Sequence, residues 1–536
     1  MKGLVSILIF VPLVAILGFV VKPLLVVDET RYLAVAWEMW NRGDFLVPHL
    51  NGATYAHKPP FLFWLMHLGW SVTGVNEWWP RLLAPIALIL DTLLVVRLGK
   101  RLWPTAPKTA YQAGILFAGT LFPVLFATGV MFDLWATLWV ILGLTALVDA
   151  HGGAPLKRTA PMAMLALGLG IVTKGPVLLL YLLPPALAAK HWSGAGSGNW
   201  KRVLQTGLLG LLGGAALALC WAIPAAILGG QEYRDAIFVG QTAGRIEDSF
   251  DHARPFWWYL PLLPIMLFPW VWWTRSYQGW KNFRAETPDV ARLLFWAIVP
   301  QFLAFSLISG KQPHYLLPMF PILALALARN LQLQGQTESS KHSMLLPMVL
   351  PGMLCLALCS APLWLERVQP PEWLTSNAML IAGAILALSM FRVLTLARHK
   401  APMVSTLAFL SPALAISILL VLGRDFRESY DVNPAAAQVA SWQEQGFQVG
   451  FLDMEYAGQL HFAGRLTQPI SNLTGREQLV TWLDQYPDGK LVVVIKRDKE
   501  PGYGIAKRPP EQFGSRLVQF WSAADFRIAL KLPTDA

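Results

Sequence analysis

The chain contains repeated apolar runs of about 18 residues or more, and each run is long enough to cross a lipid bilayer as a helix. Hydrophobic residues make up 55% of the sequence and charged residues only 14%, whereas an ordinary soluble domain carries about 25% charged residues. This pattern predicts a polytopic α-helical membrane protein and excludes a soluble globular enzyme.

The apolar pattern predicts about thirteen transmembrane helices. They are expected at residues 3–22, 79–98, 110–128, 134–150, 160–173, 175–189, 203–229, 256–274, 292–309, 314–328, 344–364, 377–396 and 402–422. The first run is expected to be a retained helix, because "MKG" is a short basic region and no A-x-A cleavage site follows. Cys220, Cys355 and Cys359 all lie inside apolar runs, so neither a disulfide framework nor a zinc site is expected.

The orientation of the helices follows from the positions of lysine and arginine. If the N-terminus is cytoplasmic, connections such as "RLGKRLWPTAPKT" and "TRSYQGWKNFRAETPDVAR" fall on the cytoplasmic side, as the positive-inside rule requires. Shifting the register by one helix would invert this bias. The formal net charge of +11 is therefore explained by membrane topology, and no nucleic-acid partner is expected.

Three segments outside the membrane are longer than simple turns. Two are the loops 22–78 and 229–255, and the third is the C-terminal part, residues 424–536, which is expected to be a separate domain from the membrane domain 1–423. "FQVGFLDMEY" and "KLVVVIKRD" are expected strands, and "NPAAAQVASWQEQ" is an expected helix. The pattern predicts a small soluble α/β domain, for which a structural cap or a partner-binding module is favoured over a direct catalytic role.

Ionisable residues from distant parts of the sequence converge on the outside face in this topology. They are Asp28, Glu29, Arg31, His57, Lys58, Asp133, Lys174, Arg245, His252, Lys311 and His314, and Tyr315 lies beside them. Each could simply be a charge at a water interface. Asp133 and Lys174, however, lie in short and otherwise apolar turns, where charged groups usually pair or take part in chemistry.

The residue types in this set suit a particular kind of ligand. Carboxylates can orient a polar substrate, act as a base or stabilise positive charge at a sugar carbon. Lysine, arginine and tyrosine suit a phosphate group. A mixed site of this kind at a membrane edge suits a lipid-linked phosphate that carries a cargo.

Several motifs resemble those of the type C glycosyltransferases of the ArnT and protein O-mannosyltransferase group, and they occur in the same order. They are "DETRY…GDFLVPHLNGATYAHKPPFLFWL", "GVMFD", "TKGP", "HARPFWWYLP" and "SGKQPHYLLPMFP". The resemblance covers about residues 1–330 and is closer to the aminoarabinose transferases than to the eukaryotic mannosyltransferases. It implies the fold of that group, with the active site on the periplasmic side of the bacterial inner membrane.

The resemblance also implies an activity. Such enzymes transfer a sugar from a polyprenyl phosphate donor to an acceptor with inversion at the anomeric carbon. In the aminoarabinose transferases the donor is undecaprenyl-phosphate aminoarabinose and the acceptor is a lipid A phosphate, a modification that protects against polymyxin-type peptides. A protein or another envelope glycan is the alternative acceptor.

The motifs assign roles to particular residues by resemblance. Asp28 and Asp133 match the catalytic carboxylates, and Lys58, Arg245 and Tyr315 match or complete the grip on the donor phosphate. Further substrate contacts are expected from the remaining polar residues of these motifs. They are Glu29, Arg31, Tyr32, His57, Lys174, His252, Lys311 and His314.

The sequence departs from the family pattern at His57, where a glutamate usually precedes the lysine. A protonated histidine would repel a cationic amino sugar, so the departure concerns the identity of the donor more than the reaction. His57 and His252 could together ligate a divalent metal. Two histidines are a weak signal, and no metal or other cofactor is expected.

Two other classes of function compete with the transferase. A transporter of a lipid-linked sugar would fit a polytopic protein, but the sequence has no obvious inverted repeat, and Asp91 is the main charged residue inside an expected helix. A scaffold whose C-terminal domain binds an envelope partner would not require the motifs before residue 330. The transferase hypothesis accounts both for the polytopic pattern and for the motifs before residue 330.

Overall fold

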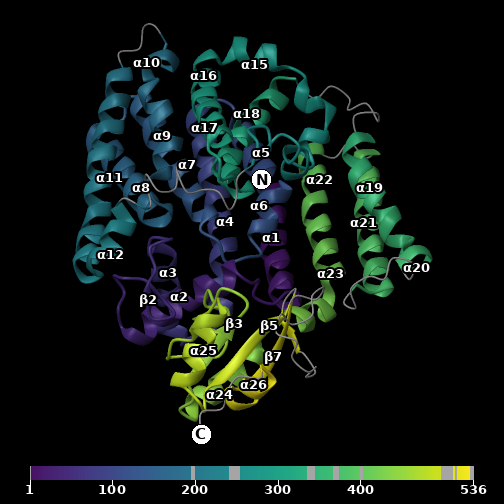
Figure 1. The fold of residues 1–536 in the computed structure, drawn as a ribbon. Coiled ribbons are helices and arrows are strands. Elements are labelled where there is room, and N and C mark those ends of the chain that lie inside the picture. The colour runs from purple at the N-terminus through teal and green to yellow at the C-terminus, as the bar shows by residue number, and fades with distance from the viewer. Residues whose placement is uncertain are drawn as a thin grey trace. The chain divides into compact units, whose positions relative to one another are not determined.

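The structure, a computed structural model, describes residues 2–194, 199–238, 240, 254–334, 345–365, 374–398, 402–495, 511–513 and 516–530. The chain divides into two compact units (Figure 1). Unit 1 comprises Met1–Phe19, Ala56–Pro370 and Thr375–Val421, and unit 2 comprises Val20–Tyr55, Pro371–Leu374 and Leu422–Ala536. Residues 22–78, expected as one outer loop, therefore divide between the two units.

Helices dominate the described part of unit 1. Its α-helices are α1 (Lys2–Val21, whose last two residues belong to unit 2), α3 (Phe61–Thr73), α4 (Trp78–Leu102), α5 (Pro107–Ala118), α6 (Leu121–Phe126), α7 (Asp133–His151), α8 (Leu156–Lys174), α9 (Leu179–Leu187), α10 (Ala189–Trp192), α11 (Trp200–Leu228), α12 (Gly230–Asp235), α14 (Leu263–Met266), α15 (Trp280–Glu286), α16 (Pro288–Trp296), α17 (Val299–Leu307), α18 (Phe320–Leu333), α19 (Leu345–Cys359), α20 (Ala361–Trp364), α21 (Ser376–Arg398), α22 (Met403–Ala408) and α23 (Leu410–Tyr430, which continues into unit 2). Its 3₁₀ helices are η1 (Pro176–Leu178), η4 (Trp270–Trp272), η5 (Thr274–Tyr277) and η6 (Pro313–Met319).

The chain is a multi-pass membrane protein. Eight helical segments in the described residues are long and apolar enough to cross a bilayer. They are Gly3–Val21, Trp78–Leu102, Asp133–His151, Trp200–Leu228, Pro288–Leu307, Pro313–Leu333, Ser376–Ala397 and Met403–Leu422. Three shorter apolar segments accompany them, at Phe61–Thr73, Pro176–Leu187 and Leu345–Cys359. The total of about thirteen transmembrane helices stays a prediction.

Proline and glycine explain where expected helices are broken. The expected helix 256–274 is wrong as a continuous element: the structure has turns, the short α14 and the 3₁₀ helix η4 in this region. Pro261, Pro264 and Pro269 interrupt the segment, because proline lacks a backbone N–H and clashes with the preceding turn. The expected helix 110–128 is likewise divided into α5 and α6, and α5 ends at Ala118, directly before Gly119.

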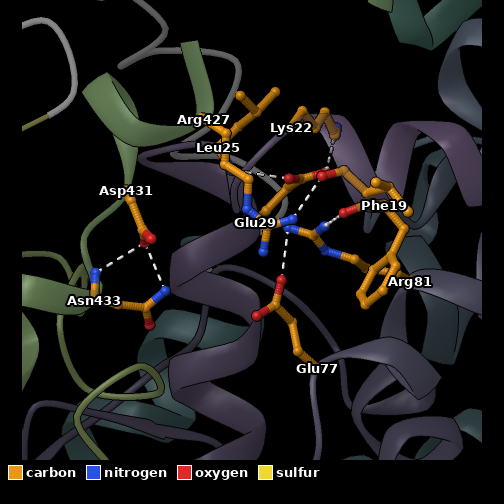
Figure 2. Close-up of polar contacts among 10 residues, drawn as sticks. Phe19, Lys22, Leu25, Glu29, Glu77, Arg81, Arg427, Asp431 and Asn433 are labelled. Carbon is orange, nitrogen blue, oxygen red and sulfur yellow. Dashed lines mark hydrogen bonds and ion pairs between the residues drawn. The ribbon is translucent and has the colours of Figure 1, made fainter. Parts of the chain in front are cut away.

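Small residues set the packing of long helices in unit 1. α8 and α11 pack so closely that a Cβ atom on Gly210 would lie 2.7 Å from the Cβ of Ala163, and one on Gly214 would lie 2.7 Å from the Cβ of Leu167. Glycines four residues apart on one helix allow such close backbone approach between membrane helices. At one end of α4, the buried Arg81 pairs with Glu77 at 2.8 Å and donates to the carbonyl oxygen of Phe19 at 3.1 Å (Figure 2).

Unit 2 contains a mixed five-stranded sheet in the order β4-β3-β5-β7-β6. Its strands are β3 (Val449–Leu452), β4 (Ser471–Leu473), β5 (Lys490–Ile495), β6 (Glu511–Phe513) and β7 (Arg516–Ser522). β3, β4 and β5 run parallel, whereas β7 is antiparallel to both β5 and β6, with Lys490 opposite Ser522. The two segments expected as strands in the sequence contain β3 and β5.

Helices cover both faces of this sheet (Figure 1). α24 (Asn433–Glu444) packs on the face formed by Val449, Phe451 and Val492. α25 (Arg476–Gln485) and α26 (Ala523–Ala529) pack on the opposite face, with Leu452 and Leu491. The alternation of Phe451 and Leu452 between the two cores is the period-two pattern of a strand buried on both sides.

The first segment of unit 2 folds as a helix and a hairpin, both outside the elements expected from the sequence. The helix is α2 (Asp28–Arg42), and the hairpin pairs β1 (His49–Leu50) with β2 (Ala53–Thr54). Asn51 and Gly52 form its turn with φ of 55° and 84°, as a two-residue turn of this type requires. The carboxylate of Glu38 on α2 accepts from the Gly52 N–H at 2.9 Å and fixes the hairpin to the helix.

Candidate functional site

A buried ion pair joins two helices of unit 1. Asp133 is the first residue of α7 and Lys174 is the last residue of α8, so an antiparallel helix pair brings them to the same end. The Lys174 ammonium donates to the Asp133 carboxylate, and both residues are less than a tenth exposed. A second contact joins the same two helices: the Trp139 indole on α7 donates to the hydroxyl of Thr173, which directly precedes Lys174, at 2.9 Å. The expected proximity of two charges in short apolar turns thus takes the form of a direct pair.

Residues of η6 complete one side of this pair. The Lys174 ammonium lies 5.1 Å from the centre of the Tyr315 ring, a distance at which a cation and an aromatic face attract. The His314 and Tyr315 rings lie 5.0 Å apart and nearly perpendicular. His314 and Tyr315 are both partly accessible, whereas Asp133 and Lys174 are buried. The structure therefore brings together four residues singled out from the sequence.

Two tyrosines that sequence reasoning missed hold the backbone of this segment. The buried Tyr181 hydroxyl on α9 donates to the carbonyl oxygen of Tyr315 at 2.5 Å, and the buried Tyr259 hydroxyl donates to the carbonyl oxygen of Gln312 at 3.1 Å. Their acceptors are main-chain atoms, which carry no sequence signature. The motif "HARPFWWYLP", which contains Tyr259, was the only signal that could have pointed to either residue.

Lys58 approaches the same carboxylate from the segment before α3. Its ammonium lies 5.8 Å from the centre of the Phe132 ring, and Phe132 directly precedes Asp133. Pro59 and Pro60 follow Lys58 and restrict the backbone before α3 begins at Phe61. His57, by contrast, is exposed.

The charges of this cluster are unequal. Lys58, Lys174 and His314 all interact electrostatically with the single carboxylate of Asp133. Basic groups outnumber acidic ones, so the cluster can accept an additional anion while Asp133 stays paired. The arrangement therefore fits a phosphate group better than a cationic ligand.

Lys311 and Arg254 lie next to each other in the same unit. The buried Lys311 ammonium donates to the carbonyl oxygens of Arg254 at 3.0 Å and of Ile308, and the Arg254 N–H donates to the carbonyl oxygen of Ser309 at 3.0 Å. Lys311 thus joins two loop segments through their main chains, while Arg254 is exposed. Arg254 is a third residue, after Tyr181 and Tyr259, that the sequence interpretation passed over.

The remaining acidic candidates lie in unit 2. Asp28, the first residue of α2, is exposed, whereas Glu29 is buried. The Glu29 carboxylate accepts from the Lys22 ammonium at 3.0 Å and from the Leu25 N–H at 2.9 Å (Figure 2). Arg31 is partly exposed and Tyr32 is buried on the same helix. The two neighbouring carboxylates of "DE" therefore have opposite environments.

Two predicted residues, Arg245 and His252, lie outside the described residues. The possible metal pair of His57 and His252 is therefore not described either. Within the described ranges, no group of three or more histidine, cysteine, aspartate or glutamate side chains is arranged to hold a metal ion.

Comparisons with known sequences place this chain near lipid-linked sugar transferases. A family described as dolichyl-phosphate-mannose-protein mannosyltransferase matches residues 57–227. An undecaprenyl phosphate-alpha-4-amino-4-deoxy-L-arabinose arabinosyl transferase of Edwardsiella ictaluri is 32% identical over 57% of this chain and 55% of the relative. The protein of the same description from Pseudomonas aeruginosa is 30% identical over 74% of this chain and 70% of the relative. The chain thus spans a little over half of the first relative and 70% of the second.

Solved structures show the same fold. The crystal structure of ArnT from Cupriavidus metallidurans bound to undecaprenyl phosphate has a TM-score of 0.74 and 19% identity, covering 96% of this chain and 97% of that one. The apo structure of the same protein has a TM-score of 0.76 and 18% identity, with 97% and 98% covered. The likeness extends over nearly the whole of both chains.

Proposed function

The chain belongs to the family of the undecaprenyl phosphate-aminoarabinose arabinosyl transferases, and on that premise we propose that it is an inverting glycosyltransferase that uses a polyprenyl-phosphate sugar. The proposed donor is an undecaprenyl phosphate carrying an aminoarabinose-like sugar. The proposed acceptor is a lipid A phosphate at the periplasmic face of the inner membrane. The observation that carries the proposal is the buried Asp133–Lys174 pair with Lys58, His314 and Tyr315 around it.

The basic groups of this cluster are proposed to bind the donor phosphate. Lys58 and Tyr315 would supply an ammonium and a hydroxyl, and Arg245, which lies outside the described residues, is proposed from its motif to supply a guanidinium. Lys174 would add a further positive charge while it remains paired with Asp133. As the bond from the anomeric carbon to the donor oxygen breaks, the electron pair leaves with the polyprenyl phosphate, and these groups stabilise the growing negative charge.

The carboxylates are proposed to act on the sugar and the acceptor. A lipid A phosphate is already an anionic nucleophile near neutral pH, so its oxygen can attack the anomeric carbon without a strong general base. Asp133 would stabilise the positive charge that develops at that carbon. Asp28, which is exposed at the start of α2, is proposed as the second acidic residue of the reaction. A hydroxyl acceptor would require Asp28 to take a proton.

The other predicted contact residues differ in whether they are accessible to a substrate. His57, Arg31 and His314 are accessible enough to meet a substrate directly. Glu29, Tyr32 and Lys311 are buried, and Glu29 and Lys311 are already engaged with groups of the protein. We therefore assign Glu29 and Lys311 to positioning, and propose His57 as a direct contact of the donor sugar.

The experiment is transfer by the purified full-length protein in proteoliposomes that contain undecaprenyl-phosphate aminoarabinose and lipid A. Mass spectrometry should detect lipid A carrying the added sugar, together with released undecaprenyl phosphate. The Lys58→Gln variant should require a higher donor concentration, because a phosphate contact is lost, whereas Lys190→Gln, at an exposed position near the C-terminal end of α10, should behave like the wild type.

Three outcomes would contradict the proposal. Absence of modified lipid A when donor and acceptor are both present would reject this substrate pair. Transfer of the sugar to a protein or to another glycan instead would show that the acceptor is not lipid A. Passage of the donor across the vesicle membrane without any transfer would favour a transporter.

A further inference from the structure

A cavity of about 550 Å³ opens in unit 1 between residues of α1, α4 and α5. It is lined by Leu4, Leu93, Val96, Arg97, Lys100, Arg101 and Tyr111. The three helices are close together here: a Cβ atom on Gly114 of α5 would lie 2.7 Å from the Val96 side chain and 3.1 Å from the Leu4 side chain. None of these residues belongs to the candidate site around Asp133.

The lining separates into an apolar wall and a basic rim along one side of α4. Leu93, Arg97 and Lys100 follow one another at spacings of four and three residues, which places them on one helix face. Leu93 is 48% exposed, and it precedes the exposed Arg97 by one turn. A bound molecule would therefore contact the apolar Leu93 side chain and, one helical turn further along α4, the positive charge of Arg97.

The cations of the rim differ in how far they are neutralised. The Arg101 guanidinium lies 3.3 Å from the Asp149 carboxylate, which is also paired with Arg158 at 3.2 Å. The Lys100 ammonium lies 4.8 Å from the centre of the Tyr111 ring, an interaction that leaves its charge intact. With Arg97 beside it, the rim retains an excess of positive charge.

The position of the cavity along the membrane follows from α7. Asp149 is near the C-terminal end of this 19-residue helix and Asp133 is its first residue. At about 1.5 Å per residue, the helix separates its two ends by nearly the thickness of a bilayer hydrocarbon core. Because Arg101 pairs with Asp149, the cavity lies at the membrane face opposite to the Asp133 cluster.

We propose that this cavity binds the head group of an anionic phospholipid from the leaflet opposite to the candidate active site. Arg97 and Lys100 would contact the phosphate with support from Arg101, and an acyl chain would lie along Leu93 and Val96. A basic pocket between helix ends at a membrane surface is suited to this ligand. The positive-inside rule alone would explain why basic residues lie at this membrane face. It would not explain why they line a cavity together with an exposed leucine. A free phosphate would leave the apolar wall unused.

The test is native mass spectrometry of the full-length protein in detergent, with phosphatidylglycerol and phosphatidylethanolamine of identical acyl chains offered together. We expect the protein to retain phosphatidylglycerol in preference. The double variant Arg97→Gln/Lys100→Gln should weaken this retention by about tenfold or more, since each basic residue near a lipid surface contributes substantially to binding. Transfer of sugar plays no part in this readout, so the result is independent of the proposed function.

The matched control is Lys190→Gln/Lys201→Gln, which removes the same charge from exposed positions outside the cavity. It should retain phosphatidylglycerol within about twofold of the wild type. The charge-preserving variant Arg97→Lys/Lys100→Arg should also bind, which separates loss of charge from loss of folding. Equal retention of both lipids, equal losses in the two glutamine variants, or displacement of the lipid by excess glycerol 3-phosphate would each overturn the proposal.

Discussion

Two buried lysine–carboxylate pairs, one in each unit, have the same chemistry and different surroundings. In Asp133–Lys174 and in Glu29–Lys22, every side chain is less than a tenth exposed. The second carboxylate oxygen of Glu29 accepts from the Leu25 N–H, so this pair is completed by the main chain beside it. The Asp133 pair is instead bordered by Lys58, His314 and Tyr315.

The difference shows how two similar ion pairs can serve opposite purposes. A carboxylate saturated by its own chain fixes the turn between α1 and α2 and has little capacity left for a ligand. A carboxylate surrounded by cations and accessible aromatic rings can respond to an incoming charge. Burial alone therefore does not identify a functional pair; the type and accessibility of its neighbours do.

The strongest test of this comparison is removal of the carboxylate at Asp133. We expect Asp133→Asn to lower kcat/KM for sugar transfer by about 10²–10³-fold, the usual consequence of losing an electrostatic contact to the transition state. The Asp133→Asn/Lys174→Met double variant should recover thermal stability, because it no longer buries an unpaired lysine. Its transfer activity should stay low. Recovery of both properties would mean that the pair is only structural.

The same design applied to Glu29 should give the opposite result. Glu29→Gln leaves the buried Lys22 without its carboxylate and should lower the free energy of unfolding by about 3 kcal/mol. The Glu29→Gln/Lys22→Met double variant should regain most of that stability and transfer sugar at nearly the wild-type rate. A double variant that is stable but inactive in the proteoliposome assay would show that Glu29 contacts a substrate.

The sequence allowed the Asp133 cluster to be anticipated, because its members follow from topology. Any antiparallel pair of helices brings the start of one to the end of the other, so Asp133 and Lys174 had to be neighbours once α7 and α8 were recognised. Hydropathy also identified the long apolar helices. It failed at residues 256–274, where the composition is apolar but the prolines prevent a continuous helix.

The association of residues 20–55 with the C-terminal part could not have been predicted in the same way. The Trp37 indole donates to the carbonyl oxygen of Leu466 at 2.8 Å, and Asn51 bonds to the main chain of Ile470, more than 400 residues away in the sequence. Main-chain acceptors are common to all residue types and leave no pattern in a sequence. The Asn51–Gly52 turn, by contrast, has a recognisable signature that predicts a hairpin.

Unit 2 should also differ from unit 1 in its response to acid. Tyr456 and His461 form a buried pair at 2.6 Å, and burial lowers the pKa of His461 to about 4. Because an unfolded histidine has a pKa of about 6.5, the unfolded state binds more protons between these values, and stability falls as the pH drops through that range. At pH 5 the loss should be about 2 kcal/mol, levelling off below pH 4.

Hydrogen exchange of residues 433–473 at pH 7 and pH 5 measures this loss. His461→Gln keeps a polar side chain at the site but removes the titration, so the exchange of this variant should depend less on pH than that of the wild type. An identical pH dependence in both proteins would assign the acid response to groups other than His461.

The smallest expected effect concerns the contact between the hairpin and the C-terminal part. The Asn51 amide donates to the carbonyl oxygen of Ile470 at 2.8 Å, and its oxygen accepts from the Ile470 N–H at 2.7 Å. Asn51→Gly keeps the positive φ without strain but loses both hydrogen bonds, and should lower the free energy of unfolding by about 1 kcal/mol. Asn51→Asp keeps the acceptor oxygen and should lower the free energy of unfolding by less.

If the C-terminal part positions α2, the helix that carries Asp28, the Asn51→Gly variant should show faster hydrogen exchange in α2. It should also have a lower kcat with little change in the donor KM. Unchanged exchange in α2 would mean that this contact holds the hairpin alone.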